Sequence, residues 1–315
     1  MTNRPTGYIY DQSVIDSNVA EFAAAGVNLQ SPFAGSAQRL IDSGVTYMNL
    51  VDNEVEFLAS NRSGYTKTGR KIAEAGSFQP VSQRTGICVG CGFSTAQWLA
   101  WVSRYVNSGD CELPQEVSLI APYLLGRNGL RGDSGAYPSY SARSSHDYGV
   151  LTVADVDGSM NPEAQENVAI SRRDSSAMDK SWIDAMSNRK TRVYQPREMM
   201  GIADCIANLY PVTVGMGYQI TESTPATKGI SSFYRLNGGH ETCVTGWFMS
   251  GGQLHFIKSE SWGDFPGSNW PGKHVTVNVD NRGPIKLYIG QGACKAIDLW
   301  YHRPECWAIG YVGSV

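Results

Sequence analysis

Three side chains in this sequence could together carry out nucleophilic catalysis: the Cys91 thiol, the His240 imidazole and the Glu260 carboxylate. A glycine-rich stretch ends at Cys91 and runs into an apolar, almost uncharged segment, so we expect Cys91 at the N-terminus of a buried helix. The helix dipole and free backbone N–H groups there stabilise the thiolate, which is the nucleophilic form. An adjacent imidazole can take up and return a proton, and a polar group behind it fixes its orientation.

Five segments of the chain resemble, in the same order, the active-site segments of papain-like cysteine peptidases. The nucleophile segment is 80–94, which contains Gly-Ile-Cys-Val-Gly-Cys-Gly-Phe-Ser, and 132–138 is similar to the segment that lines the cleft. The strand before the histidine is matched by 206–214, the histidine strand by 238–247, and the Asn-Ser-Trp-Gly segment by 257–263, which contains Glu-Ser-Trp-Gly. Five ordered matches are far more specific than any single motif.

The resemblance implies a role for each matched residue. Cys91 would be the nucleophile and His240 its general base, within the roughly 130–150 residue spacing of such enzymes. Glu260 would orient the imidazole in place of the family's asparagine, with Ser259 as the alternative. Gln83 would donate to the oxyanion if Arg84 and Thr85 bulge outward. The implied substrate-binding residues are Ser134, Gly135, Ala136, Gly239 and Trp262.

The chain also departs from the family pattern. Gly92 stands where the family has Trp-Ala, and Thr85 stands where an ungapped alignment expects the oxyanion glutamine. Asp133 replaces the cysteine that usually pairs with the one matched by Cys88, so we expect Cys88 to be a free thiol. Weak amidase or peptidase activity is therefore the expectation.

Three functions are compatible with these residues. The first is a thiol hydrolase that cleaves peptide or other amide bonds in a peptide or protein substrate. The second is a papain-fold protein with little or no activity that serves as a structural or binding component of a large assembly, such as a phage virion. The third is an acyltransferase, which uses the same Cys-His chemistry.

The elements that must position these residues follow from the sequence pattern. Helical spacing of apolar residues predicts a helix over 13–25, and the apolar run 93–106 predicts another, stopped at Gly109. The second half reads as strands, at 211–216, 240–248, 254–258, 275–279 and 285–289. Helices followed by strands predict an α+β, papain-like fold of two subdomains. We expect an N-terminal segment 1–79, prosegment-like or accessory, and a domain 80–315, helical to about 205 and β-rich from about 206.

The composition of the chain limits the kinds of binding partner and the compartment that we expect. The chain has 315 residues and a net charge of -3, which gives no electrostatic case for nucleic acid or an anionic membrane surface. No run approaches the ~20 apolar residues of a membrane span, and the N-terminus does not look like a signal peptide. The seven cysteines have no disulfide-like spacing, so a reducing compartment is expected, either the cytoplasm or a virion. The Cys88-x-x-Cys91 pair lacks a second pair, and we expect no metal and no cofactor.

Overall fold

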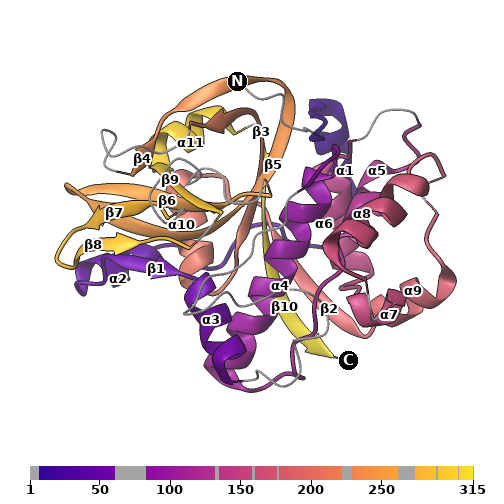
Figure 1. Ribbon diagram of the computed structural model, residues 1–315, viewed down its shortest axis with the longest axis horizontal. Coiled ribbons are helices and arrows are strands. Elements are labelled where there is room, and N and C mark those ends of the chain that lie inside the picture. Colours follow the sequence, from indigo (N-terminus) through magenta and orange to yellow (C-terminus); the bar gives the residue numbers. More distant parts are fainter. Residues whose placement is uncertain are drawn as a thin grey trace.

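The computed structural model describes residues 7–60, 83–131, 135–157, 160–175, 177–221, 229–261, 274–288, 290–303 and 305–314. In these ranges a helical half faces a β-rich half, with helix α4 between them (Figure 1). The α+β class predicted from the sequence is confirmed. The helices are α1 Gln12–Ala24, α2 Ser36–Asp42, α3 Val51–Ser60, α4 Cys88–Ser108, α5 Ile120–Arg127, α6 Pro138–Asp147, α7 Val153–Asp157, α8 Pro162–Ser171, α9 Lys180–Met186, α10 Met199–Ala207 and α11 Ala296–His302.

The main sheet has the strand order β2-β10-β3-β5-β6-β9-β4, with β1 paired to β5, and β7 and β8 form a separate pair. Strand β2 comes from the otherwise helical stretch and pairs with the C-terminal strand β10. The sheet thus extends into the helical half, where β2 and β10 pack against α6. The strands are β1 Tyr47–Asn49, β2 Arg189–Tyr194, β3 Val212–Ile220, β4 Ile230–Ser231, β5 Phe233–Ser250, β6 Gln253–Ser259, β7 Thr276–Val279, β8 Gly283–Lys286, β9 Gln291–Lys295 and β10 Glu305–Ser314.

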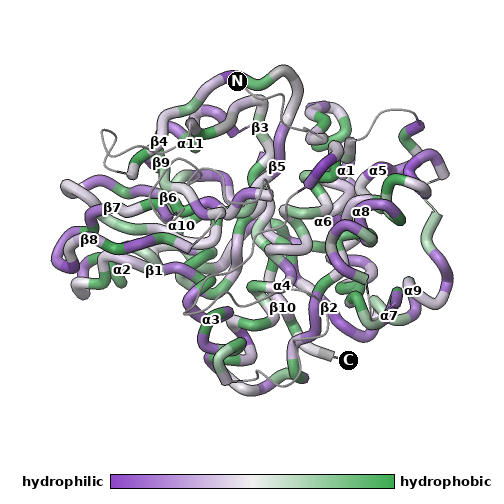
Figure 2. The backbone as a smooth tube through the Cα atoms, viewed as in Figure 1, coloured by the Kyte–Doolittle hydropathy of each residue, from purple (hydrophilic) through white to green (hydrophobic). Residues whose placement is uncertain are grey.

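Helix α4 is the central element of the core. Its residues from Cys88 to Ser103 are buried except Thr95, as expected for a nearly uncharged helix. It ends at Gly109, whose left-handed backbone (φ 67°) lets its N–H bond back to Tyr105. Figure 2 shows hydrophobic residues gathered where α4 meets the strands. The helix therefore joins the two halves through one apolar interface.

The β5–β6 hairpin sets the positions of the candidate catalytic residues. Gly251 and Gly252 both have positive φ (58° and 72°), as a tight two-residue hairpin turn requires. The turn sets the register as far as the Gly246–Ile257 pair, and a bulge between Val244 and Gly246 then pairs Cys243 with Ser259. His240 on β5 and Glu260 just beyond β6 are thereby brought to the same end of the hairpin.

Residues 7–60 pack into the cores of both halves. Phe22 and Leu29 belong to the cluster that also contains Cys88, and Leu50 belongs to the β-half cluster. Phe57 on α3 packs edge-on against Trp98 of α4, with 5.8 Å between ring centroids. Trp98 Nε1 donates to Glu54, which is also buried. Among the described helices, none is both long and apolar enough to cross a bilayer.

Candidate active site

Helix α4 begins at Cys88, one turn earlier than the sequence suggested. The backbone N–H of Cys91 already donates to Ile87 O at 3.1 Å, so Cys91 lies within the helix. The expectation that Cys91 stands at the helix N-terminus is therefore wrong, and Cys88 stands there. The buried Glu166 carboxylate fixes the loop before the helix, accepting from the backbone N–H groups of Arg84 (3.0 Å) and Thr85 (2.7 Å).

Two glycines let the first turns of α4 pack closely against their neighbours. A Cβ on Gly90 would lie 2.8 Å from Leu119 O, and one on Gly92 would lie 3.0 Å from Glu241 Cγ. The bulky side chain that the family carries just after its nucleophile would not fit at Gly92. This close packing sets the first turn of α4 directly against β5.

His240, Glu260 and Lys258 form a buried array. His240 Nε2 lies 3.2 Å from Glu260 Oε2, and Lys258 Nζ lies 3.2 Å from Glu260 Oε1. All three side chains are fully buried. The backbone N–H of Glu260 donates to Gly290 O at 2.8 Å, which fixes its position. Ser259 instead hydrogen-bonds with Thr245 and Gln291, so Glu260 is the residue that contacts the imidazole.

Gln83 lies beside the residue that follows Glu260. Its backbone N–H donates to Ser261 O at 2.8 Å, its side-chain oxygen accepts from Ser261 Oγ, and its amide nitrogen donates to Thr85 O at 2.9 Å. The Gln83 side chain is thus held at the rim of the site, with its amide turned toward its own loop.

Cys91 faces a very small cavity. The cavity measures about 10 Å³, which is room for one water molecule at most. Its lining comes from α4, β5 and the end of β6: Cys91, Gly92, Thr95, Glu241, Thr242, Ser259, Glu260 and Ser261. Cys91 is 1% exposed, so neither this cavity nor the surface offers it to a peptide.

Residues 7–9, here called the strap, occupy the backbone groups expected to bind substrate. Gly7 N and Tyr8 N donate to Gly239 O (3.0 and 3.1 Å), Ile9 N donates to Ala136 O (3.1 Å), and Ala136 N donates to Gly7 O (2.9 Å). Gly135 lies against the strap, since a Cβ there would be 2.9 Å from Ile9 Cδ1. Ser134 and Trp262, the other expected substrate-binding residues, lie outside the described residues, as does Asp133.

Close contacts with glycine hold the strap in place. A Cβ on Gly7 would lie 1.8 Å from Gly86 O, and one on Gly239 would lie 2.3 Å from Tyr8 Cδ1. The Tyr8 ring rests on Gly215, where a Cβ would lie 2.5 Å from Tyr8 Cε2. Tyr8 is 5% exposed. The strap is thus packed as tightly as a protein interior.

Two buried carboxyl groups flank the Tyr8 ring. Glu305, Gly215 and Glu241 lie in one cross-strand row, with Gly215 in the middle. Burial raises the pKa of Glu305 to about 8. Burial, and secondly the nearby Glu305, raises the pKa of Glu241 well above its ordinary value. Burial and the two carboxyl groups also raise the pKa of Tyr8. All three groups are therefore most stable in their neutral forms.

We expect this row to make folding stability fall with rising pH. The folded-state pKa of Glu305 lies above its ordinary 4.5, so its contribution is complete below about pH 4.5 and is lost as the pH rises through about 8. Within that window the loss is about 1.4 kcal/mol per pH unit. Glu305→Gln should flatten this slope in urea unfolding measured at several pH values, while the exposed Glu56→Gln should not. An unchanged slope in Glu305→Gln would show that the folded-state pKa of this carboxyl is not raised.

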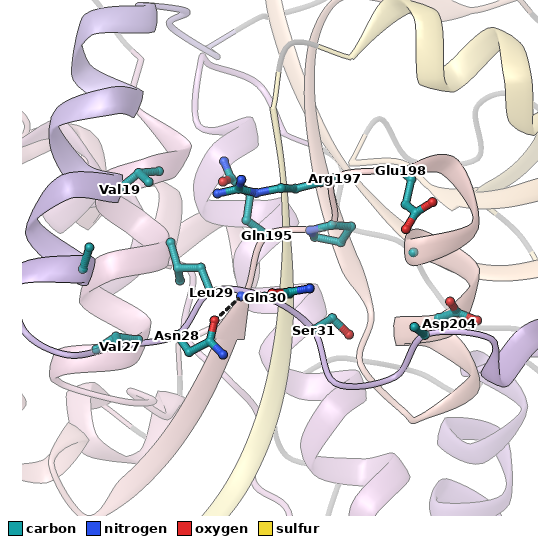
Figure 3. A pocket seen from close by; sticks show the side chains of 14 residues that line it. Val19, Val27, Asn28, Leu29, Gln30, Ser31, Gln195, Arg197, Glu198 and Asp204 are labelled. Carbon is teal, nitrogen blue, oxygen red and sulfur yellow. Dashed lines mark hydrogen bonds between the residues drawn. The ribbon is translucent and has the colours of Figure 1, made fainter.

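A second hollow lies away from these residues. It measures about 410 Å³ and lies between the segment that follows α1 and the start of α10, with Gln30, Gln195, Arg197 and Asp204 among its lining residues (Figure 3). None of the candidate catalytic or substrate-binding residues that the structure describes lines it. Among the described residues, no three histidine, cysteine, aspartate or glutamate side chains gather as metal ligands would.

No protein-family model and no curated protein matches the sequence. Among solved structures, the chain is similar to xylellain, a cysteine protease from Xylella fastidiosa, with a TM-score of 0.51 and 17% identity over 75% of this chain and 83% of that one. It also aligns with proCathepsin B S9 from Trypanosoma congolense (TM-score 0.44, 11% identity, 99% of this chain, 87% of that one). A third match is digestive procathepsin L 3 of Tenebrio molitor larval midgut (TM-score 0.40, 16% identity, 96% and 90%). The chain therefore has the α+β fold of papain-like cysteine proteases.

Proposed function

We propose that this protein is a thiol hydrolase of peptide or other amide bonds. The observation that carries the proposal is the buried contact between His240 and Glu260, with His240 in the middle of β5, the strand that packs against α4. An imidazole held by a carboxylate can take a proton from a thiol and return it to a leaving amine. The nucleophile would be a thiol of the first turn of α4, where Cys88 and Cys91 both lie.

The groups that would stabilise the oxyanion and bind the substrate come from the start of α4, from Gln83 and from the backbone groups that the strap now occupies. Backbone N–H groups in the first turn of a helix have no partner within the helix and can donate to a developing oxyanion. Gln83 would add a second donor if its amide turned away from Thr85. Gly135, Ala136 and Gly239 would pair with the backbone of an extended peptide once the strap has left. The seven cysteines are free thiols, as a reducing compartment such as the cytoplasm or a virion would keep them.

The strap supports a second candidate function. Its hydrogen bonds use the same backbone groups that a substrate would use. If the strap never leaves, the chain would serve as a structural or binding component of a large assembly, for example a phage virion. If it leaves and an amine or alcohol replaces water as the acceptor, the same groups would support acyl transfer.

Removing the imidazole tests the hydrolase proposal. Turnover of peptidyl amides that release a fluorescent amine should fall by about 10²–10⁴-fold in His240→Ala, because the general acid-base group is lost. His255→Ala serves as the control, since that buried imidazole on β6 stacks on Phe248 and bonds with Gln253. Equal turnover in the two variants, or none in the wild-type chain even with the strap released, would rule out the hydrolase.

A further inference from the structure

The two thiols in the first turn of α4 have different surroundings. Cys88 is the first residue of the helix, where the dipole and the free N–H groups act most strongly on a thiolate. Cys91 is the fourth residue of the helix, its N–H is bonded to Ile87, and its carbonyl accepts from Ser94 Oγ at 3.1 Å. The electrostatic argument for a reactive thiol therefore applies to Cys88.

Cys88 also lies against the backbone on both sides of His240. The amide of Glu241, which follows His240, is within hydrogen-bonding reach of the Cys88 thiol, and so is the amide of Gly7. The same Gly7 amide donates to Gly239 O, which precedes His240. Cys91 shares its small cavity with Glu241, Thr242 and Glu260, the last of which contacts His240. The Cys88 thiol thus lies near the amide that follows the histidine and near the Gly7 amide that bonds to the residue before it.

The strap marks where a peptide lies relative to the two thiols. Gly7 is in contact with Gly86, two residues before Cys88, and its amide, which donates to Gly239 O, also acts on the Cys88 thiol. The strap is a peptide held by backbone hydrogen bonds in the cleft, so the thiol directly beneath it is the one that a bound substrate would meet. The cavity that Cys91 lines has room for one water molecule at most.

We propose that Cys88, and not Cys91, is the nucleophilic thiol of this site. The inference rests on the proposed hydrolase function and deepens it. The Cys88 thiol proton passes to His240, and the sulfur forms a bond to the substrate carbonyl carbon while the π pair moves onto the oxygen. When that pair returns, the C–N bond breaks and the leaving nitrogen takes the proton from the imidazolium. Water then attacks the thioester carbonyl carbon and gives a proton to His240. The S–C bond breaks, the carboxylic acid product leaves, and His240 returns that proton to the sulfur.

The state of Cys88 beneath the strap is inert. Burial raises the pKa of the Cys88 thiol to about 12, although the amides of Glu241, Gly7 and Val89 act in the opposite direction. Departure of the strap removes part of that burial and leaves the amide of Glu241 and the helix N-terminus in place. The thiol thereby becomes both accessible and more readily ionised.

Thiol mapping tests the assignment in the full chain. Gly7→Ala should release the strap, because its Cβ would lie 1.8 Å from Gly86 O. In that background, iodoacetamide at neutral pH followed by peptide mass mapping should label Cys88 at least about ten-fold faster than Cys91. Cys91→Ser should leave Cys88 as the labelled residue, and Cys88→Ser should abolish fast labelling. Tyr8→Ala provides a second strap-loosening background in case Gly7→Ala does not fold.

Peptidyl-amide turnover in the same variants separates the two proposals. Turnover that depends on Cys88 supports both of them. Fast labelling at Cys91, or turnover that survives Cys88→Ser and is lost in Cys91→Ser, would overturn the assignment and leave the hydrolase standing. Fast Cys88 labelling without any turnover would support the assignment and overturn the hydrolase. Slow, equal labelling of both thiols would overturn both.

Discussion

Replacing Gly7 with alanine is expected to raise both the rate of thiol alkylation and the rate of peptidyl-amide turnover by on the order of 10²-fold, because the strap would no longer fit against Gly86. The new Cβ would lie 1.8 Å from a backbone carbonyl oxygen, which cannot move aside without shifting the loop before α4. Four backbone hydrogen bonds hold the strap, each with a net stabilisation of about 0.5–1.5 kcal/mol. Burial of the Tyr8 ring adds about 1.5–3 kcal/mol. Ordering the strap residues offsets part of that sum, about 1–2 kcal/mol each.

The matched control is Gly217→Ala. Gly217 lies on β3, two residues from the Gly215 that supports Tyr8, and a Cβ there meets nothing within 4 Å. Tyr8→Ala should raise the rates of alkylation and turnover by less, because it removes the ring that packs on Gly215 but keeps the backbone hydrogen bonds of the strap. If Gly7→Ala alkylates no faster than Gly217→Ala, the strap does not control access. If it alkylates faster yet hydrolyses nothing, the structural role becomes the better account.

The parts of the site that were predictable from sequence depend on local signals. The apolar run after Cys91 indicated a buried helix, and the strands predicted at 240–248 and 254–258 are found as the β5–β6 hairpin. Because these two strands pair, a contact between His240 and one of Ser259 and Glu260 could be expected. The choice between Ser259 and Glu260 needed coordinates, because an irregularity in the β5–β6 pairing falls near Val244.

The rest depends on contacts between residues distant in sequence. Nothing in Gly7-Tyr8-Ile9 distinguishes it from an ordinary terminal segment, and its partners Ala136 and Gly239 are far along the chain. The start of α4 was misplaced by one turn, because Gly90 and Gly92 read as loop residues. They are helical here because α5 and β5 leave no room for side chains at those positions. Glu241 looks like a surface charge by type, but it is 1% exposed, because its side chain lies against Gly92 of α4 and Gly215 of β3.

Removing the charge on Lys258 is expected to destabilise the protein by about 3–5 kcal/mol, since it leaves the Glu260 carboxylate buried without its cation. Lys258 and Glu260 together carry no net charge, so the Glu260 carboxylate beside His240 is balanced by the cation on its other oxygen. In Lys258→Met the imidazole should hold its proton to higher pH, because the carboxylate then acts on it alone. In Lys258→Met the pH dependence of alkylation and of turnover should therefore shift to higher pH, and the urea midpoint should fall.

A double variant separates the charge effect from a packing effect. Lys258→Met/Glu260→Gln removes both charges, so much of the lost stability should return, whereas a cavity or clash at position 258 would persist in both variants. Lys295→Met is the control, because this lysine is exposed on the neighbouring strand β9 and should change stability by no more than about 0.5 kcal/mol. A Lys258→Met protein as stable as Lys295→Met would show that Glu260 is neutral in the folded state. In that case Glu260 would itself carry a proton, and it could orient His240 only as a neutral hydrogen-bonding group, as an asparagine would.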